Sequence, residues 1–207
     1  MVGPCAGQAE RVASRRRGAA LEDAILQAAY EELSESGYTA FSVESVAARA
    51  RTGKASIYRR WTTKAELVMD ALCAALPEAD EAGLVPQLPD SVSTADALRG
   101  MAEAITAVLA SPAGDAMRAV KCEAATDPSL ARLIDDRFQA PRRRAMLALL
   151  RRGVERGEVR PDAATPLVAD VLPAVLSHRV ILQREPITKR TITDIIDQVL
   201  LPLIEVR

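Results

Sequence analysis

The chain has 207 residues, a formal net charge of −1, 49% hydrophobic residues and only 3% aromatic residues. This length allows one or two domains with a sizeable core, and the excess of alanine, leucine and charged residues favours an all-helical soluble protein. No run approaches the roughly 18 uncharged apolar residues of a membrane span. Three scattered cysteines without a Cys-x-x-Cys pair argue against a disulfide framework or a zinc site, and they fit a cytoplasmic protein.

The N-terminal part combines a basic arm with one amphipathic helix. Residues 1–17 are rich in Gly, Ala and Arg and show no hydrophobic period, so we expect a mobile basic arm. From about Ala19 to Ser36 apolar residues recur every four positions, which predicts a helix ended by Gly37.

Residues 42–67 predict two short helices joined by a tight turn, followed by the start of a further helix. Ser42 is a suitable N-cap for the first helix and Thr52 for the second, and Thr63 with Glu66 forms a capping box for the third. Two short helices with a turn of about three or four residues match helix-turn-helix geometry, in which the second helix enters the major groove of DNA.

Cations are concentrated in this segment although the whole chain is nearly neutral, and no acid lies between Arg49 and Lys64. At the start of the second helix, Lys54 can donate to guanine, Ala55 can contact a thymine methyl group, and Ser56 can serve a base or a phosphate. The remaining polar side chains are better placed for phosphates. The predicted DNA-contacting set is Ser42, Thr52, Lys54, Ala55, Ser56, Tyr58, Arg59, Arg60 and Lys64.

The alternative interpretation of these cations is an ordinary solvated helix face. The caps, the turn and the paired short helices favour DNA binding over that alternative. Ile57 and Trp61 lie four positions apart, and we expect them to pack in the core.

Residues 77–93 contain three prolines and four acids, and they predict a linker between a domain at 18–76 and another at 91–207. Helical periodicity resumes at Thr94, the expected N-cap of the next helix, with interruptions before Pro112 and Pro128, at Pro141 and at Gly157. Two segments at about 166–183 and 191–206 are too apolar for fully solvated helices, so they are expected to be buried within the chain or in a dimer.

The run A-A-R-A-R-T-G-K-A-S-I-Y-R-R-W-T-T-K-A-E-L resembles the TetR family of bacterial transcriptional regulators. The close resemblance covers roughly residues 19–70, and A-P-R-R-R followed by L-L-R-R-G-V-E-R-G-E-V-R-P-D is similar to the C-terminal domain of one branch of the family. The resemblance implies an N-terminal three-helix helix-turn-helix DNA-binding domain and a C-terminal helical ligand-binding and dimerisation domain. It also implies a homodimer formed by the last two helices, a double-stranded, near-palindromic DNA operator and a small-molecule effector.

One residue departs from the family pattern. Arg51 stands in the turn where the family usually has glycine, and that position often needs a left-handed backbone. Two interpretations are open: the turn is shifted so that Gly53 takes up part of the strain, or Arg51 is kept for a phosphate contact.

The effector site implied by the resemblance would be apolar, which predicts a hydrophobic small molecule. Ordinary core packing is the alternative for each candidate. The candidate lining residues are Met101, Ile105, Met117, Cys122, Phe138, Met146, Leu150, Leu172, Val175 and His178.

The function expected from these features is a sequence-specific DNA-binding regulator, a repressor released by a small apolar ligand. The first alternative is an architectural or non-transcriptional DNA-binding protein on the same fold. A single histidine, with no phosphate-binding loop, nucleophile elbow or metal-ligand spacing, argues against an enzyme, and no cofactor or metal is expected. A redox sensor would have to use Cys73 or Cys122, which lie in apolar helical settings where thiols are usually inert.

Overall fold

The computed structural model of the chain describes residues 6–76, 91–183 and 185–206, and for residues 6–17 we describe the backbone alone. The protein is all-α, as the composition predicted. The described part contains no strand, and it has one isolated antiparallel bridge between Val159 and Glu205. The chain divides into two compact units, the first ending at Ala75 and the second beginning at Leu76. Within the described ranges, no helix is both long enough and apolar enough to span a membrane.

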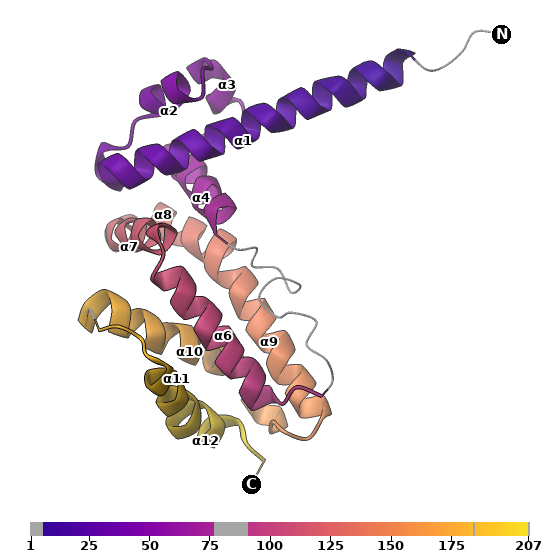
Figure 1. Ribbon diagram of the computed structural model, residues 1–207, viewed down its shortest axis with the longest axis vertical. Helices are drawn as coiled ribbons and strands as arrows, with labels where there is room; N and C mark the ends of the chain where they lie inside the picture. The colour runs from indigo at the N-terminus through magenta and orange to yellow at the C-terminus, as the bar shows by residue number, and fades with distance from the viewer. Residues whose placement is uncertain (1–5, 77–90, 184, 207) are drawn as a thin grey trace, which may run out of the picture. The chain divides into compact units, whose positions relative to one another are not determined.

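The first unit consists of α1 (Ala6–Ala40), α2 (Val43–Arg49), α3 (Lys54–Tyr58) and α4 (Lys64–Ala75) (Figure 1). Helix α1 packs against α2 and α4, and α2 packs against α3. The helices meet around an apolar core that includes Ile25, Leu33, Val46, Ile57, Trp61, Leu67 and Leu72.

Helix α1 begins much earlier than the expected start near Ala19. Residues 6–17 continue it as helix, because Ala, Arg, Gln and Glu have high helix propensity and only one glycine interrupts them. Residues 1–5 of the predicted arm, and nearly all of the predicted linker, lie outside the described residues. At the expected stop the regular helix is broken, because Gly37 has φ 72° and ψ 174°, a conformation that is almost exclusive to glycine. Helical turns resume after this break and extend α1 to Ala40.

The predicted caps of this unit are confirmed except for one. Ser42 caps α2 by accepting from the Ser45 N–H (3.3 Å). Thr63 and Glu66 form the reciprocal capping box, with bonds of 3.1 and 3.2 Å between side chain and backbone. The prediction that Thr52 caps α3 is wrong, because Gly53 occupies the N-cap position and no side chain completes the cap.

The turn between α2 and α3 uses the left-handed backbone that the family pattern indicated. Arg51 has φ 50°, and no other non-glycine residue in the described part of the chain has a positive φ. Gly53 is extended, with φ −87° and ψ 148°. The strain therefore stays at Arg51, and Gly53 does not take it up.

The second unit contains a further set of helices around α6 (Figure 1). Helix α6 packs against α7, α9, α10 and α11. The helices are α6 (Thr94–Leu109), α7 (Pro112–Ala124), α8 (Pro128–Ile134), α9 (Ala140–Glu155), α10 (Pro166–His178), α11 (Lys189–Ile195) and α12 (Leu201–Ile204). Wider π-helical turns occupy Asp135–Gln139, Arg179–Gln183 and Ile196–Leu200, and a short 3-10 turn occupies Pro161–Ala163.

Two of the π-helical turns precede a proline. Pro141 lies near the start of α9 and Pro202 near the start of α12, in both cases directly after such a turn. A proline in a continuous helix lacks an N–H donor and clashes with the carbonyl one turn earlier, and a wider turn relieves this conflict. The expected interruption at Pro141 therefore has the form of a π-helical turn.

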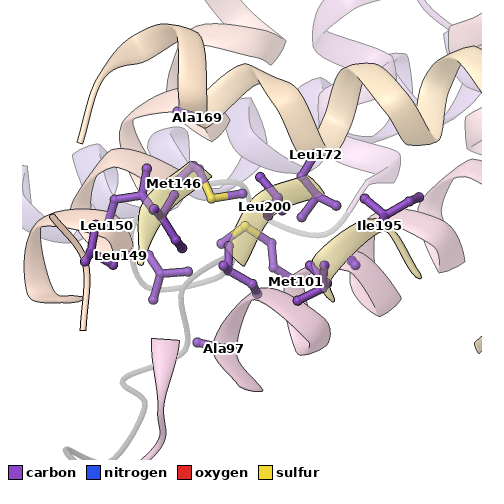
Figure 2. Close-up of a cluster of buried hydrophobic side chains, with 14 of the residues drawn as sticks. Ala97, Met101, Met146, Leu149, Leu150, Ala169, Leu172, Ile195 and Leu200 are labelled. Carbon is purple, nitrogen blue, oxygen red and sulfur yellow. The ribbon is translucent and has the colours of Figure 1, made fainter. Parts of the chain in front are cut away.

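The core of the second unit is apolar and comes from α6, α9, α10, α11 and the C-terminal turns (Figure 2). Leu150 and Leu172 belong to it and are 1% and 0% exposed. The members labelled in the close-up are Ala97, Met101, Met146, Leu149, Leu150, Ala169, Leu172, Ile195 and Leu200.

A polar junction joins the end of α9 to the start of α6. Ser93, rather than the expected Thr94, is the N-cap of α6, and the Thr94 N–H donates to Glu158 Oε2 (2.6 Å). Arg156 donates to the same carboxylate (Nε to Oε1, 3.0 Å) and to the Thr94 hydroxyl (3.0 Å). The Arg156 and Thr94 bonds lower the pKa of Glu158 to about 2. Gly153 completes the junction, because a Cβ there would lie 2.6 Å from Thr94 Oγ1.

Candidate nucleic-acid interface and effector cavity

Helix α3 is held in place by one face. Ile57 and Trp61 are 1% and 4% exposed, as expected for core residues. The Trp61 indole N–H also donates to Asp70 on α4 (2.8 Å), so a polar bond fixes the end of the helix-turn-helix against the next helix. This anchoring leaves the opposite face of α3 in solvent.

That free face carries the predicted base-reading residues. Lys54 and Ala55 are exposed, Ser56 is half-buried, and Tyr58 is 52% exposed. Exposure of a large aromatic side chain on a short cationic helix suits contact with another molecule. The structure thus brings Lys54, Ala55 and Ser56 together at the N-terminal end of α3, where recognition helices contact base edges.

Most cations of this surface interact within the first unit. Lys54 Nζ pairs with Glu44 on α2 (2.6 Å), and this bond raises the pKa of Lys54 and lowers that of Glu44. Arg59 donates to the Ser56 hydroxyl (2.9 Å). Arg60 donates to the Ser56 carbonyl (3.0 Å) and lies 3.8 Å from Glu22 on α1.

Lys64 has an internal role that the sequence did not indicate. Its ammonium donates to the carbonyls of Tyr38 (2.6 Å) and Thr39 (3.4 Å), and it lies 4.4 Å from the centre of the Tyr38 ring. It therefore stabilises the segment that follows Gly37. A phosphate contact by Lys64 stays a prediction, as do the contacts by Ser42 and Thr52.

Arg51 is a candidate that the predicted contact set omitted. It is exposed, and its guanidinium makes no hydrogen bond or ion pair with any residue of the described ranges. By contrast, Arg49 turns toward α1, where it pairs with Glu35 and with Glu32 (3.4 Å). A charged side chain kept at a strained backbone position was the signal in the sequence that could have identified Arg51.

The second unit contains a cavity of about 430 Å³ bounded by α6, α7, α9 and α10. Met101, Ile105, Met117, Phe138 and Met146 line it, as predicted.

The other predicted lining residues lie elsewhere. Leu150 and Leu172 are in the packed core, Val175 packs against the same core, Cys122 is exposed beside a separate groove, and His178 is exposed. The α10 wall is instead made of Ala169, Pro173, Ala174 and Ser177, together with Asp170. The small side chains of α10 leave room for the cavity. The large apolar residues that the sequence suggested, Leu172 and Val175, are neighbouring α10 positions that pack in the core.

One end of the cavity is cationic. The Arg142 guanidinium lies 3.6 Å from the centre of the Phe138 ring, and Lys121 Nζ lies 5.3 Å from it. Arg143 is neutralised by Asp170 (2.8 Å), and Arg118 by Asp115 (2.6 Å). Burial lowers the pKa of the half-buried Lys121, and the nearby Arg142 charge lowers it further. Among the described residues, no cluster of three His, Cys, Asp or Glu side chains is arranged to hold a metal.

These features define a helix-turn-helix DNA-binding protein with a second helical domain. Comparison with protein families agrees: residues 25–71 match the bacterial regulatory proteins of the tetR family, and residues 88–199 match the tetracyclin repressor-like C-terminal domain. The second match alone covers more than half of the chain. The chain belongs to the TetR family of transcriptional regulators.

Its relatives are similar along nearly their whole length. An uncharacterized HTH-type transcriptional regulator of Mycobacterium tuberculosis is 33% identical over 202 residues, which cover 98% of this chain and 96% of the relative. The DNA-binding transcriptional repressor TetR of Mycobacteroides abscessus is 35% identical over 195 residues, covering 91% and 96%. The crystal structure of a TetR-family regulator from Mesorhizobium loti shares the fold, with a TM-score of 0.71 at 19% identity over 92% of this chain and 99% of that one.

Proposed function

We propose that the protein is a cytoplasmic transcriptional repressor that binds a near-palindromic operator as a homodimer and is released by a small molecule. The observation that carries this proposal is α3, which buries Ile57 and Trp61 and leaves Lys54, Ala55 and Tyr58 in solvent. The first unit would supply DNA binding, and the second would supply dimerisation and the ligand site. Repression, rather than activation, is proposed by analogy with the Mycobacteroides abscessus repressor.

Base reading by Lys54 requires an exchange of partners. In the free protein its ammonium is held by Glu44, and on DNA it would move to guanine acceptors in the major groove. Both groups of the pair are well exposed, so releasing it costs little in water. Replacing Glu44 by Gln should therefore strengthen binding to all sequences, because it frees Lys54 and removes a negative charge near the phosphates.

Phosphate contacts are proposed for Tyr58, Arg59, Arg60 and Arg51, with Ser42, Thr52 and Lys64 at the edges. Each phosphate neutralised by a cation contributes roughly 0.9 to the salt slope of binding. Loss of one of the arginines in this set should weaken binding to all DNA sequences alike, whereas loss of Lys54 should relax base preference at one position of each half-site.

Dimerisation is supported by apolar side chains left exposed near the C-terminus. Apart from Tyr58, every large hydrophobic residue that is exposed in the described ranges lies between positions 166 and 206. These residues are Leu167, Leu182, Val199, Leu203 and Val206. Exposed apolar groups of this kind favour contact with a second copy. Sedimentation should give a dimer, and Leu203→Glu should shift it toward the monomer.

The cavity supports the proposed effector. Its volume of about 430 Å³ falls in the range of small-molecule sites, roughly 300–1,000 Å³, and most of its lining is apolar. A ligand there would act by favouring one spacing of the two DNA-binding units, and a near-complete switch needs about 5.5 kcal/mol of differential affinity.

Selection of bound DNA from a random pool tests the proposal. We expect an inverted repeat whose half-sites are about 34 Å apart, or a multiple of this distance. Lys54→Ala should reduce discrimination at one base pair of each half-site by about 1–3 kcal/mol. Lys189→Ala removes an exposed lysine of the second unit and serves as the matched control. Unchanged selectivity of Lys54→Ala would show that α3 is not the recognition helix.

The second candidate is an architectural DNA-binding protein on the same fold. It would recover DNA without a consensus sequence, and its affinity would vary little among sequences. The same selection experiment therefore separates the two functions.

A further inference from the structure

Positive charge is concentrated in one part of the lining of the proposed effector cavity. Two cations from different helices, Lys121 on α7 and Arg142 on α9, lie over the ring of Phe138 at one end. The rest of the wall is largely apolar, including Met101, Ile105 and Met117.

The lining contains more positive than negative charge. Among the described residues of the lining, the cations are Arg118, Lys121, Arg142 and Arg143, and Asp170 is the only acid. Asp170 is occupied by Arg143 (Nε to Oδ1 2.8 Å, to Oδ2 3.0 Å), and Arg118 is paired with Asp115 (2.6 Å).

Lys121 is the distinctive group of this set. Within the described ranges, its ammonium makes a contact with the Phe138 ring and no salt bridge to a carboxylate. Half-burial without a counter-charge is unfavourable for an ammonium group, and the adjacent guanidinium of Arg142 adds repulsion. An anion bound beside both groups would relieve both costs, and it would gain charge-assisted hydrogen bonds from Lys121.

We propose that the cavity binds an amphipathic organic acid, with its anionic group at Lys121 and Arg142 and its apolar body along Met101, Ile105 and Met117. This inference rests on the proposed ligand function of the second unit and names its ligand class. A neutral hydrophobic ligand would leave the half-buried ammonium of Lys121 without a carboxylate or other anion beside it. A cationic ligand would add a third positive charge at the same end.

A matched pair of fluorescent probes tests the charge requirement on the full-length protein. Anilinonaphthalenesulfonate is anionic, and N-phenylnaphthylamine has the same two aromatic groups without the charge. We expect the sulfonate to bind at least about tenfold more tightly than the neutral amine, the factor typical of one charge-assisted bond. Equal affinities of the two probes would overturn the proposal.

Variants locate the binding of the charge. Lys121→Met keeps the length and apolar stem of the side chain, and it should weaken sulfonate binding about tenfold while leaving the neutral probe unchanged. Lys121→Arg should retain sulfonate binding. Lys189→Met, at an exposed position outside the cavity lining, should change neither affinity. A loss as large in Lys189→Met as in Lys121→Met would refute the site, because it would indicate sulfonate bound elsewhere.

Stability distinguishes a binding role from a structural one. Because Lys121 makes no salt bridge with any residue that the structure describes, and because the Arg142 charge is nearby, Lys121→Met should unfold at the same temperature as the unaltered protein or at a higher one. A lower unfolding temperature, with both probes weakened equally, would mean that Lys121 holds the cavity open instead of binding the anion. Probe binding is measured without DNA, so failure of operator binding would refute the proposed repressor function and leave this result intact.

Discussion

Replacing Arg51 by glycine is expected to stabilise the first unit. The residue has φ 50°, and a left-handed backbone costs a non-glycine residue about 1–2 kcal/mol. Glycine adopts this conformation freely, but it loses roughly 0.5–1 kcal/mol more entropy on folding. Since the Arg51 guanidinium has no partner among the described residues, no contact is lost. The net gain in the free energy of unfolding is therefore about 0–1.5 kcal/mol, with a central value of about 0.75 kcal/mol.

The chain contains its own reporter for this measurement. Trp61 is the only tryptophan, it is 4% exposed, and it lies directly after α3. Its fluorescence during a urea titration of the full-length protein follows unfolding of the first unit. Arg51→Ala is the matched control, because it removes the guanidinium and keeps the strained backbone, so it should stay within about 0.5 kcal/mol of the unaltered protein.

Two outcomes would refute the reasoning about strain. If Arg51→Gly were no more stable than the unaltered protein, the left-handed backbone would carry no cost. If Arg51→Ala were stabilised as much as Arg51→Gly, the gain would come from removing the side chain. DNA binding provides an independent readout, because both variants should lower the salt slope of operator binding by roughly 0.9 per protomer, or about 1.8 for the proposed dimer, if Arg51 contacts a phosphate.

Other positions lead to predictions that can be checked by denaturation. Glu158→Gln should lower the free energy of unfolding by roughly 1–2 kcal/mol. This figure is reduced for solvent screening, because the Glu158 side chain is 36% exposed. Folding lowers the pKa of Glu158 from 4.5 to about 2, so the carboxylate stabilises the fold fully above pH 4.5 and ceases to do so as the pH falls toward 2. Between these pH values the variant should therefore lose less stability than the unaltered protein. Gly153→Ala should destabilise the second unit by about 1–3 kcal/mol, because its Cβ would clash with Val159 and Thr94; a temperature of unfolding equal to that of the unaltered protein would contradict the close packing. Gly37→Ala should lower the urea midpoint of Trp61 fluorescence by an amount equivalent to about 1–3 kcal/mol, and no shift would mean that the backbone there relaxes.

Features that depend on neighbouring residues could be predicted from the sequence. The break at Gly37, the cap at Ser42, the capping box at Thr63 and Glu66 and the two-helix unit between them were all found, because each rests on a pattern within a few positions. The fixed order of residue types in the same segment also identified the family. Where the predicted cap was wrong, the true cap was an adjacent residue: Gly53 in place of Thr52, and Ser93 in place of Thr94.

Tertiary structure decided what depends on residues far apart in the chain. Lys64 belongs to the cation run in the sequence, yet it donates to a carbonyl 26 positions earlier. The cavity is lined by small residues of α10 together with Phe138 and Lys121, an arrangement set by how separate helices pack. Hydrophobic periodicity in the sequence indicates which face of a helix is buried. It does not indicate whether the side chains of the neighbouring helix fill the space beside that face. The sequence by itself therefore determined the fold class, the helix-turn-helix segment and the family, and only the packing of distant helices decided which cations pair within the chain and where a ligand has room.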